Sequence, residues 1–321
     1  MKTILYIGGF FDAEYSMWHS FKEHNVEIIF IQEPEYPQYN EPLFPNILYS
    51  ANLPGVLAEY KPDLVIHRYC SHFSGVYGDC SQLVSSFGIP YIVYRIESCF
   101  DTLPQTTPIK KYDCDLFLYA NHIDIPFLNQ DKQAFWSWGV STFDKNRHIE
   151  RDIPFAGFGK AHEFNNRREN LKTFVAGCAP DKVTVFWGSS VAGFWSDLFA
   201  GLDIRLGFDM KDQIVMMNRT NIALNFETCP HIHGVYSYKL FQTMACGTPT
   251  ISFHKQEYKD MFEGALLEVE SSDDISKAID SLNNKDTWEE VSRKSEAVLH
   301  RKFDWYTNFK QILQDFGMDV L

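Results

Sequence analysis

Short apolar runs recur along the first half of this sequence, and each is followed by a longer polar stretch with helical spacing. The runs lie at residues 3–8, 26–32, 64–68, 91–95, 116–119 and 134–138. Segments such as 28–31 and 64–66 are continuously apolar, which is typical of parallel strands buried on both faces. This alternation of strands with helices predicts a doubly wound parallel sheet, an α/β fold with a Rossmann-like arrangement.

A second α/β unit of the same kind follows in the sequence. Its expected strands are residues 154–157, 183–186, 204–206, 222–226, 250–253 and 266–269, and its expected helices are 165–177, 192–200, 211–218, 236–246, 256–263, 273–283 and 286–300. Ser272-Asp-Asp274 is expected to cap the helix at 273–283. The charged, non-periodic stretch 141–152 lies between the two units and is predicted to be a linker.

The length of 321 residues suits two domains of about 150 residues each. We expect an N-terminal domain at 1–145, a second domain at 152–303 and a last helix at 304–321. Two doubly wound sheets bind ligands at the carboxyl ends of their strands, so the two domains are expected to face a cleft.

The composition indicates in which cellular compartment the protein is expected. Apolar residues make up 45% of the chain, yet no segment reaches the ~18 consecutive apolar residues of a membrane span. Residues 1–8 resemble a first strand rather than a signal peptide. The seven cysteines show neither C-x-x-C spacing nor the density of a disulfide scaffold. We therefore expect a cytoplasmic protein with reduced thiols and no membrane span. The net charge of −13 argues against a general polyanion-binding surface.

The segment 236–252 is the strongest candidate for a ligand site. A helix that begins near Ser237 presents free backbone N–H groups and the positive end of its dipole, which suits a phosphate. Lys239 and Gln242 are three residues apart and share one face of this helix. Gly247 and Pro249 end the helix before the next strand, so the ligand is expected at the opposite, amino end.

The same segment resembles a known motif. Residues 239–249, Lys-Leu-Phe-Gln-Thr-Met-Ala-Cys-Gly-Thr-Pro, are similar to the motif Lys/Arg-x-Phe-Glu-x-x-Ala-x-Gly-x-Pro of GT-B glycosyltransferases. The strand 222–226, which ends in Asn-Phe, and the run 152–159 followed by Arg167-Arg168-Glu169 resemble the spore-maturation-type (group 1) members. The resemblance covers roughly residues 135–305. One position departs from the motif, since Gln242 stands where these enzymes carry a ribose-binding Glu.

The resemblance implies a two-domain GT-B fold whose C-terminal helix crosses back to the first domain. It also implies transfer of a sugar from a nucleotide diphosphate sugar, with a UDP-sugar as the expected donor, and no bound metal or other cofactor. The expected donor-binding residues are Gly8, Gly9, Gly157, Arg167, Arg168, Gly188, Glu227, His233, Tyr236, Ser237, Tyr238, Lys239 and Gln242. Tyr236 and Tyr238 have two open interpretations, stacking on a base or packing between domains.

The candidates for catalysis lie in the first domain, at the ends of predicted strands. Glu97, Asp12 and His67 are the three expected catalytic residues, with Asp101 as a further carboxylate rival. An inverting transferase needs a base within hydrogen-bond reach of the acceptor hydroxyl, whereas the departing phosphate can take that proton in a retaining one. For His67 a satisfied core histidine is the alternative interpretation.

Two further motifs resemble known binding sites but lack parts that those sites require. The run Gly157-Phe-Gly-Lys160 lacks the spacing and the hydroxyl residue of a Walker phosphate loop. His231 and His233 share one side of an extended segment, but no third metal ligand has recognisable spacing. We therefore expect neither an ATPase site nor a metal site.

Three function classes remain open at this stage. The first is a glycosyltransferase acting on a hydroxyl acceptor, for which a hydroxymethylated base in DNA is one candidate, as in phage DNA glycosyltransferases. Such a base would have to be flipped out of the duplex. The second is a nucleotide-sugar 2-epimerase, which shares the two-domain architecture. The third is a non-catalytic nucleotide-sugar or glycan-binding protein, which the change to Gln242 keeps open.

Overall fold

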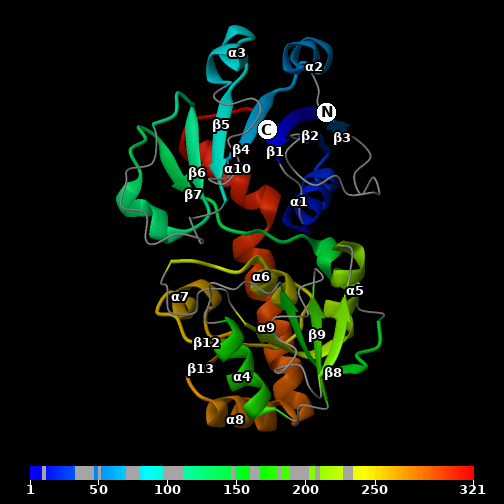
Figure 1. Ribbon diagram of the computed structural model, residues 1–321. Coiled ribbons are helices and arrows are strands. Elements are labelled where there is room, and N and C mark those ends of the chain that lie inside the picture. Colours follow the sequence, from blue (N-terminus) through cyan, green and yellow to red (C-terminus); the bar gives the residue numbers. More distant parts are fainter. Residues whose placement is uncertain are drawn as a thin grey trace. The chain divides into compact units, whose positions relative to one another are not determined.

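The protein forms two compact units, each built around one parallel sheet, in the computed structural model (Figure 1). The first unit contains Met1–Gly139 and Asp304–Leu321, and the second contains Val140–Phe303. The fold class predicted from the apolar runs is thereby confirmed, including the return of the C-terminal helix to the first unit. The structure describes residues 1–8, 12–32, 47–49, 52–69, 80–96, 111–145, 149–159, 167–178, 182–187, 202–206, 210–226 and 234–321.

The sheet of the first unit has the strand order β3-β2-β1-β4-β5-β6-β7, with every neighbouring pair parallel. Its strands are β1 (Lys2–Gly8), β2 (Val26–Gln32), β3 (Ile47–Tyr49), β4 (Leu64–Tyr69), β5 (Tyr91–Arg95), β6 (Leu116–Tyr119) and β7 (Gln133–Phe135). The register pairs Ile4 with both Ile28 and Leu64, so the apolar centres of three strands lie side by side.

Helices cover this sheet, and alternate residues of each strand contribute to opposite faces. They are α1 (Asp12–Glu23), α2 (Leu53–Tyr60), α3 (Ser81–Ser86) and α10 (Trp305–Asp315), with a 3₁₀ turn η1 at His122–Phe127. Leu5, Ile7 and Val65 pack with Leu57 of α2 and Val84 of α3 in one core cluster.

The C-terminal helix α10 belongs to the first unit because its apolar stripe is buried there. Trp305 and Phe309 are fully buried, and both rings contact Trp136, with centroid distances of 5.1 and 4.7 Å. Phe309 also packs on Phe21 of α1. Full burial of one such side chain contributes about 1.5–3 kcal/mol. The helix begins at a capped position, since Asp304 accepts a hydrogen bond from the Thr307 backbone N–H at 2.8 Å.

The sheet of the second unit has the order β10-β9-β8-β11-β12-β13 and is also parallel throughout. Its strands are β8 (Ile153–Gly159), β9 (Val183–Trp187), β10 (Asp203–Leu206), β11 (Thr220–Asn225), β12 (Thr250–Phe253) and β13 (Leu267–Val269). Its helices are α4 (Arg167–Gly177), α5 (Met210–Arg219), α6 (Tyr238–Ala245), α7 (Tyr258–Phe262), α8 (Ser272–Leu282) and α9 (Lys285–Phe303).

Both faces of this second sheet are covered. On one face Phe155, Val185 and Leu224 pack with Phe174 of α4 and Ile275 of α8. On the other face Ile153, Ala156 and Phe158 pack with residues of α5 and the end of α6, namely Met217 and Cys246. The doubly wound pattern expected from the alternating elements is therefore present in both units.

The stretch 141–152, which we predicted to be a linker, begins as a buried part of the second unit. Ser141 and Asp144 are both fully buried and form a capping box around the 3₁₀ turn η2 (Thr142–Asp144). The carbonyl of Asp144 accepts hydrogen bonds from Asn218 Nδ2 at 2.8 Å and Cys246 Sγ at 3.0 Å. Charge alone was a poor guide, because one carboxylate oxygen of the buried Asp144 accepts a hydrogen bond from the Ser141 backbone N–H at 2.8 Å.

Two smaller expectations also need correction. The helix α8 is capped by Ser271, whose side chain accepts from the Asp274 N–H at 3.2 Å, and not by Ser272, which is the first helical residue. Residues 192–200, expected to be a helix, lie outside the described residues. In the part of the chain that the structure describes, no helix combines the length and the apolar character needed to cross a membrane.

Candidate functional site

The second unit has its topological switch point between β8 and β11, because the chain winds outward from these neighbours in opposite directions. Ligands of open parallel sheets bind at this point, outside the carboxyl ends of the strands. β11 ends at Asn225 and is followed along the chain by α6, which leads to the adjacent parallel strand β12. The amino end of α6 therefore lies at the carboxyl edge of the sheet, beside the switch point.

Helix α6 is anchored by its apolar side. Leu240, Phe241, Met244 and Ala245 are fully buried, which fixes the helix on the sheet. Ser237 occupies the N-cap position with an extended backbone, but its side chain makes no capping hydrogen bond. Ser237 thus does not supply the side-chain acceptor that usually satisfies one first-turn N–H group, and the amino end of a helix suits an anionic ligand.

The opposite end of α6 is covered by donors. Arg151 Nη2 donates to the carbonyls of Cys246 at 2.8 Å and Gly247 at 3.3 Å, and Ser292 Oγ donates to Gly247 O at 2.5 Å. Burial lowers the pKa of the Arg151 guanidinium. Gly247, with φ of +65°, ends the helix in the left-handed conformation as predicted. A cation at the carboxyl end compensates the negative pole of the helix dipole, and the positive pole at the amino end stays available.

Lys239 lies in the first turn of α6 and is partly buried. Its ammonium donates a hydrogen bond to Gln213 Oε1 of α5 and lies 5.8 Å from the centroid of the Tyr238 ring. Burial lowers the pKa of Lys239 to about 7. An anion that binds beside an amine with a lowered pKa favours its protonated form, because a neighbouring negative charge raises the pKa of the amine.

Gln242, one turn further along α6, is fully buried. Neither Oε1 nor Nε2 of its amide has a hydrogen-bond partner among the described residues. A buried amide left in this state costs about 1–3 kcal/mol, so its retention requires an explanation, of which a ligand that satisfies it is one. Its Oε1 and Nε2 match the hydroxyl groups of a ribose, which both donate and accept hydrogen bonds.

Gly157 has a packing role in the structure. A Cβ atom at this position of β8 would lie 1.6 Å from Cζ of Phe226, the residue that follows β11. The absence of a side chain therefore allows the Phe226 ring to lie on β8 at the switch point. Asn225, at the end of β11, is held by a hydrogen bond from its Nδ2 to Ser252 Oγ at 2.9 Å.

Tyr236 was left with two interpretations, and the structure buries it within the second unit. Its ring lies 6.4 Å from that of Tyr258 and is 2% exposed. The neighbouring Val235 carbonyl accepts a hydrogen bond from the buried Lys255 ammonium at 2.6 Å. These contacts fix the segment that leads into α6. Tyr238 stays partly exposed in the first turn of the helix.

In the first unit the switch point lies between β1 and β4, where Gly8 adjoins Arg68. Gly8 has φ of +149°, and a Cβ atom there would lie 2.7 Å from Arg68 Cβ, so only glycine fits. Arg68 Nη1 donates to Glu14 Oε1 at 2.7 Å, and the Tyr6 hydroxyl donates to the same oxygen at 3.1 Å. Arg68 was a candidate from its place at the end of a predicted strand, but Glu14 was missed, since it belongs to no motif and lies 54 positions from its partner.

His67, expected to be catalytic, lies in the core of the first unit. The residue is 4% exposed. Its Nδ1 lies 2.7 Å from the Tyr91 hydroxyl oxygen and 3.6 Å from Cys80 Sγ. This placement favours the alternative interpretation of a satisfied core histidine.

Several other expected site residues are located only in part. Asp12 begins α1, and Arg167 and Arg168 begin α4, but their side chains lie outside the description. Glu97, Gly9, Gly188, Glu227 and His233 lie outside the described residues altogether. Within the described ranges no three His, Cys, Asp or Glu side chains gather as a metal site would require.

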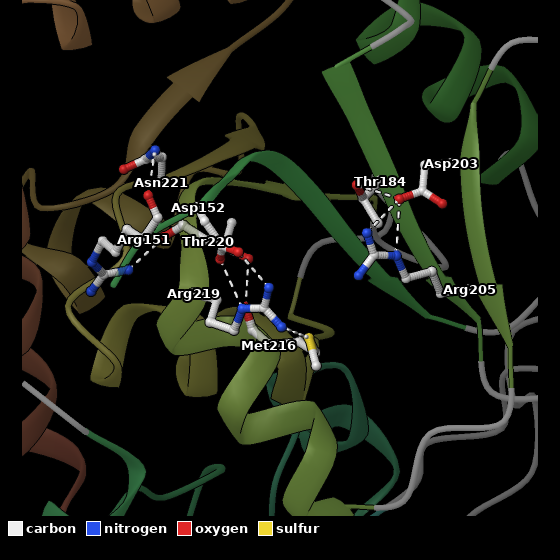
Figure 2. A network of polar contacts seen from close by, with 9 residues as sticks. All are labelled: Arg151, Asp152, Thr184, Asp203, Arg205, Met216, Arg219, Thr220 and Asn221. Atoms are coloured by element: carbon white, nitrogen blue, oxygen red, sulfur yellow. Dashed lines mark hydrogen bonds and ion pairs between the residues drawn. The ribbon is translucent and has the colours of Figure 1, made fainter. Parts of the chain in front are cut away.

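Polar contacts connect residues near the amino edge of the second sheet (Figure 2). Arg219 forms an ion pair with Asp152, and Arg205 forms one with Asp203 at 2.8 Å. Arg151 Nη1 donates to the carbonyl of Thr220 at 2.5 Å. The guanidinium groups of this edge are thus engaged by carboxylates and carbonyls of the protein itself.

Two doubly wound parallel sheets on one chain, with a helix terminus suited to phosphate at the switch point of the second, define the GT-B class of fold. Residues 167–314, a little less than half of the chain, match the family model described as glycosyl transferase-like. The matched segment runs from the start of α4 into α10, so it covers most of the second unit and part of the C-terminal segment of the first. No curated protein shows a significant sequence match to the chain.

Solved structures share this fold over their whole length. HepE from Anabaena, in complex with UDP and glucose, is 12% identical with a TM-score of 0.67, and the match covers 99% of this chain and 100% of that one. AviGT4, a glycosyltransferase involved in avilamycin A biosynthesis, is 9% identical with a TM-score of 0.65 and coverage of 100% and 98%. Sucrose-phosphate synthase from Thermosynechococcus elongatus is 12% identical with a TM-score of 0.59 and coverage of 99% and 98%.

Proposed function

We propose that the protein is a glycosyltransferase that moves a sugar from a UDP-sugar to a hydroxyl acceptor. The observation that carries the proposal is the amino end of α6, where a helix terminus without a side-chain cap from Ser237, Lys239 and the buried amide of Gln242 lie together at the switch point. This end belongs to the segment that matches the glycosyl transferase-like model. The complex of HepE with UDP and glucose supports the choice of donor.

The expected catalytic chemistry follows from the negative charge that develops on the leaving group. When the bond between the sugar and the diphosphate breaks, negative charge grows on the departing diphosphate. First-turn N–H groups of α6 and the Lys239 ammonium would stabilise that charge without a metal ion, because they are fixed before the reaction begins. α4 follows β8 in the chain, so it begins at the same edge of the sheet, and Arg167 or Arg168 at its start would add a second positive group.

The donor is tested by thermal shift with UDP, GDP, dTDP and CMP on the unaltered protein, Lys239→Ala and Lys259→Ala. Lys259 is exposed on α7 and serves as a control with the same change of charge. A ligand at 100 times its Kd stabilises the folded state by about 2.7 kcal/mol. We expect UDP to raise the Tm of the unaltered protein and of Lys259→Ala, and to raise that of Lys239→Ala far less.

Turnover is tested next by following UDP released from UDP-sugars with panels of hydroxyl acceptors. Acceptor-dependent release supports a transferase, whereas conversion of the donor to its 2-epimer without acceptor would identify an epimerase. Binding of UDP-sugars without any turnover would point to a binding protein. Oligonucleotides with a hydroxymethylated base belong in the acceptor panel, although the net charge of −13 opposes DNA binding. A protein whose Tm responds to none of the nucleotides would refute the donor assignment.

A further inference from the structure

A pocket lies at the amino edge of the second sheet, opposite the edge at which α6 begins. Phe155 of β8 pairs in register with both Val183 of β9 and Ile222 of β11, so the starts of these three strands stand side by side. Residues of the turn from α8 into α9 complete the lining. The volume of about 610 Å³ falls within the range of about 300–1,000 Å³ that is typical of small-molecule sites.

The apolar part of the lining provides a surface for a flat group. Phe155 and Ile222 are buried, whereas the ring of Trp288 on α9 is partly exposed. Two contacts fix this ring, because its Nε1 donates to the carbonyl of Asn221 at 2.9 Å and the Arg151 guanidinium lies 5.1 Å from the ring centroid. Asn221 Nδ2 donates in turn to the carbonyl of Arg151 at 3.3 Å (Figure 2). A fixed and partly exposed indole suits an aromatic ligand, since aromatic pairs are stabilised by offset or edge-to-face packing beyond the area they bury.

The described lining is cationic, although the whole chain carries a net charge of −13. It contains the basic side chains of Arg151, Lys182 and Lys285 and one carboxylate, that of Glu289. The acceptors that hold Arg151 are backbone carbonyls and a hydroxyl, which are neutral. Lys285 and Glu289 lie 3.6 Å apart with side chains 85% and 59% exposed, so solvent screens this pair and little is lost when it opens. The charge of the lining therefore favours an anion.

We propose that this pocket binds a small organic anion with a flat apolar body, of the class of aromatic carboxylates. The ring of the ligand packs on the indole of Trp288, and its carboxylate accepts hydrogen bonds from the ammonium groups of Lys182 and Lys285. A divalent cation fits less well, because the described lining offers only one carboxylate. The inference does not rest on the proposed function, since the pocket and the amino end of α6 lie at opposite edges of the sheet.

The experiment is fluorine NMR of the full-length protein labelled with fluorotryptophan and titrated with naphthoate. The chain has seven tryptophans, and Trp288→Phe identifies the signal that belongs to Trp288. We expect naphthoate to shift this signal with saturation and a Kd of about 1 mM or lower. Naphthamide, which has the same rings without the charge, should bind about fivefold more weakly. Acetate, which has the charge without the rings, should cause no saturable shift.

Lys182→Gln combined with Lys285→Gln removes both ammonium groups, so naphthoate should bind about fivefold more weakly while the Kd of naphthamide stays the same. Lys259→Gln combined with Lys277→Gln is the matched control, since both lysines are exposed on the second unit and lie outside the pocket lining. The control should change neither Kd. Equal affinity for naphthoate and naphthamide, or no shift of the Trp288 signal up to about 10 mM naphthoate, overturns the inference.

Competition with UDP separates this inference from the proposed function. If α6 binds the nucleotide, UDP leaves bound naphthoate in place, because the two sites lie at opposite edges of the sheet. Displacement of naphthoate by UDP that persists in Lys239→Ala would place the nucleotide in the pocket, which overturns the donor assignment and supports the pocket as an anion site. Absence of naphthoate binding overturns the pocket alone, since the effect of UDP on the Tm and its loss in Lys239→Ala do not depend on it.

Discussion

At the scale of single residues, Gln242 is where stability and binding are expected to oppose each other. Its buried amide lacks partners among the described residues, so the ligand-free protein carries an unfavourable polar group. We expect Gln242→Leu to raise the free energy of unfolding by about 1 kcal/mol or more, while UDP affinity falls about tenfold. Urea unfolding and calorimetric titration measure the two effects.

Gln314→Leu provides the comparison for this change, because Gln314 is exposed on α10 in the first unit. It should alter neither quantity appreciably. If Gln242→Leu destabilised the protein and left UDP binding intact, the amide would have a structural role and the ribose assignment would be wrong.

The residues of the site differ in how far the sequence foretold them. The shared helix face of Lys239 and Gln242 was predictable from their spacing, because residues three positions apart on a helix lie on the same face. Gln213 was not predictable, since it lies on another helix, 26 positions before Lys239, and α5 and α6 come together only when both pack on the same face of the sheet. The predicted donor contact of Gly157 stays a prediction, whereas its packing against the Phe226 ring was not foreseen, because no sequence pattern reveals which atom occupies the space beside a glycine.

At the scale of elements, Arg151 is expected to determine how firmly α6 is held. Its guanidinium donates to the carbonyls of Cys246, Gly247 and Thr220 and to Thr248 Oγ1. Arg151→Met keeps much of the side-chain volume but leaves these acceptors without their donor. We expect the free energy of unfolding to fall by about 2–4 kcal/mol, as measured by urea unfolding.

Arg219→Met is the matched variant on the same edge of the sheet (Figure 2). Its ion pair with Asp152 is exposed to solvent, where screening leaves little net stabilisation, so its loss should be minor. Equal effects of the two substitutions would show that Arg151 contributes as a surface charge and not as the donor that caps α6.

Most strands were predictable because burial on both faces leaves a continuous apolar run. Val26–Gln32, Tyr91–Arg95 and Leu116–Tyr119 have the bounds expected from the sequence. β3 was missed because Ile47–Tyr49 is only three residues long, and such a run also occurs in helices and loops. The 3₁₀ turn at Thr142–Asp144 was missed because the polar residues of its capping box, Ser141 and Asp144, are also typical of linkers.

At the scale of the whole molecule, the C-terminal segment Asp304–Leu321 stabilises the unit that does not contain α6. Deleting this segment exposes the surfaces of Trp136 and Phe21 on which α10 packs. In hydrogen exchange we expect the first unit to lose protection, while the second unit keeps its protection and still binds UDP. Deleting only residues 318–321 should have little effect, since these residues are exposed or partly exposed.

One hydrogen bond has a consequence for how such chains diversify. The backbone N–H of Val140 donates to the carbonyl of Phe303 at 2.8 Å, so the second unit begins and ends at adjacent points. A segment of 164 residues (303 − 140 + 1) with neighbouring ends can be exchanged as a cassette, because the host chain needs to bridge only a short gap. Recombination at these two points would replace the half that we propose to bind the nucleotide without redesign of its host, so that under this proposal donor choice and acceptor choice would be separately heritable.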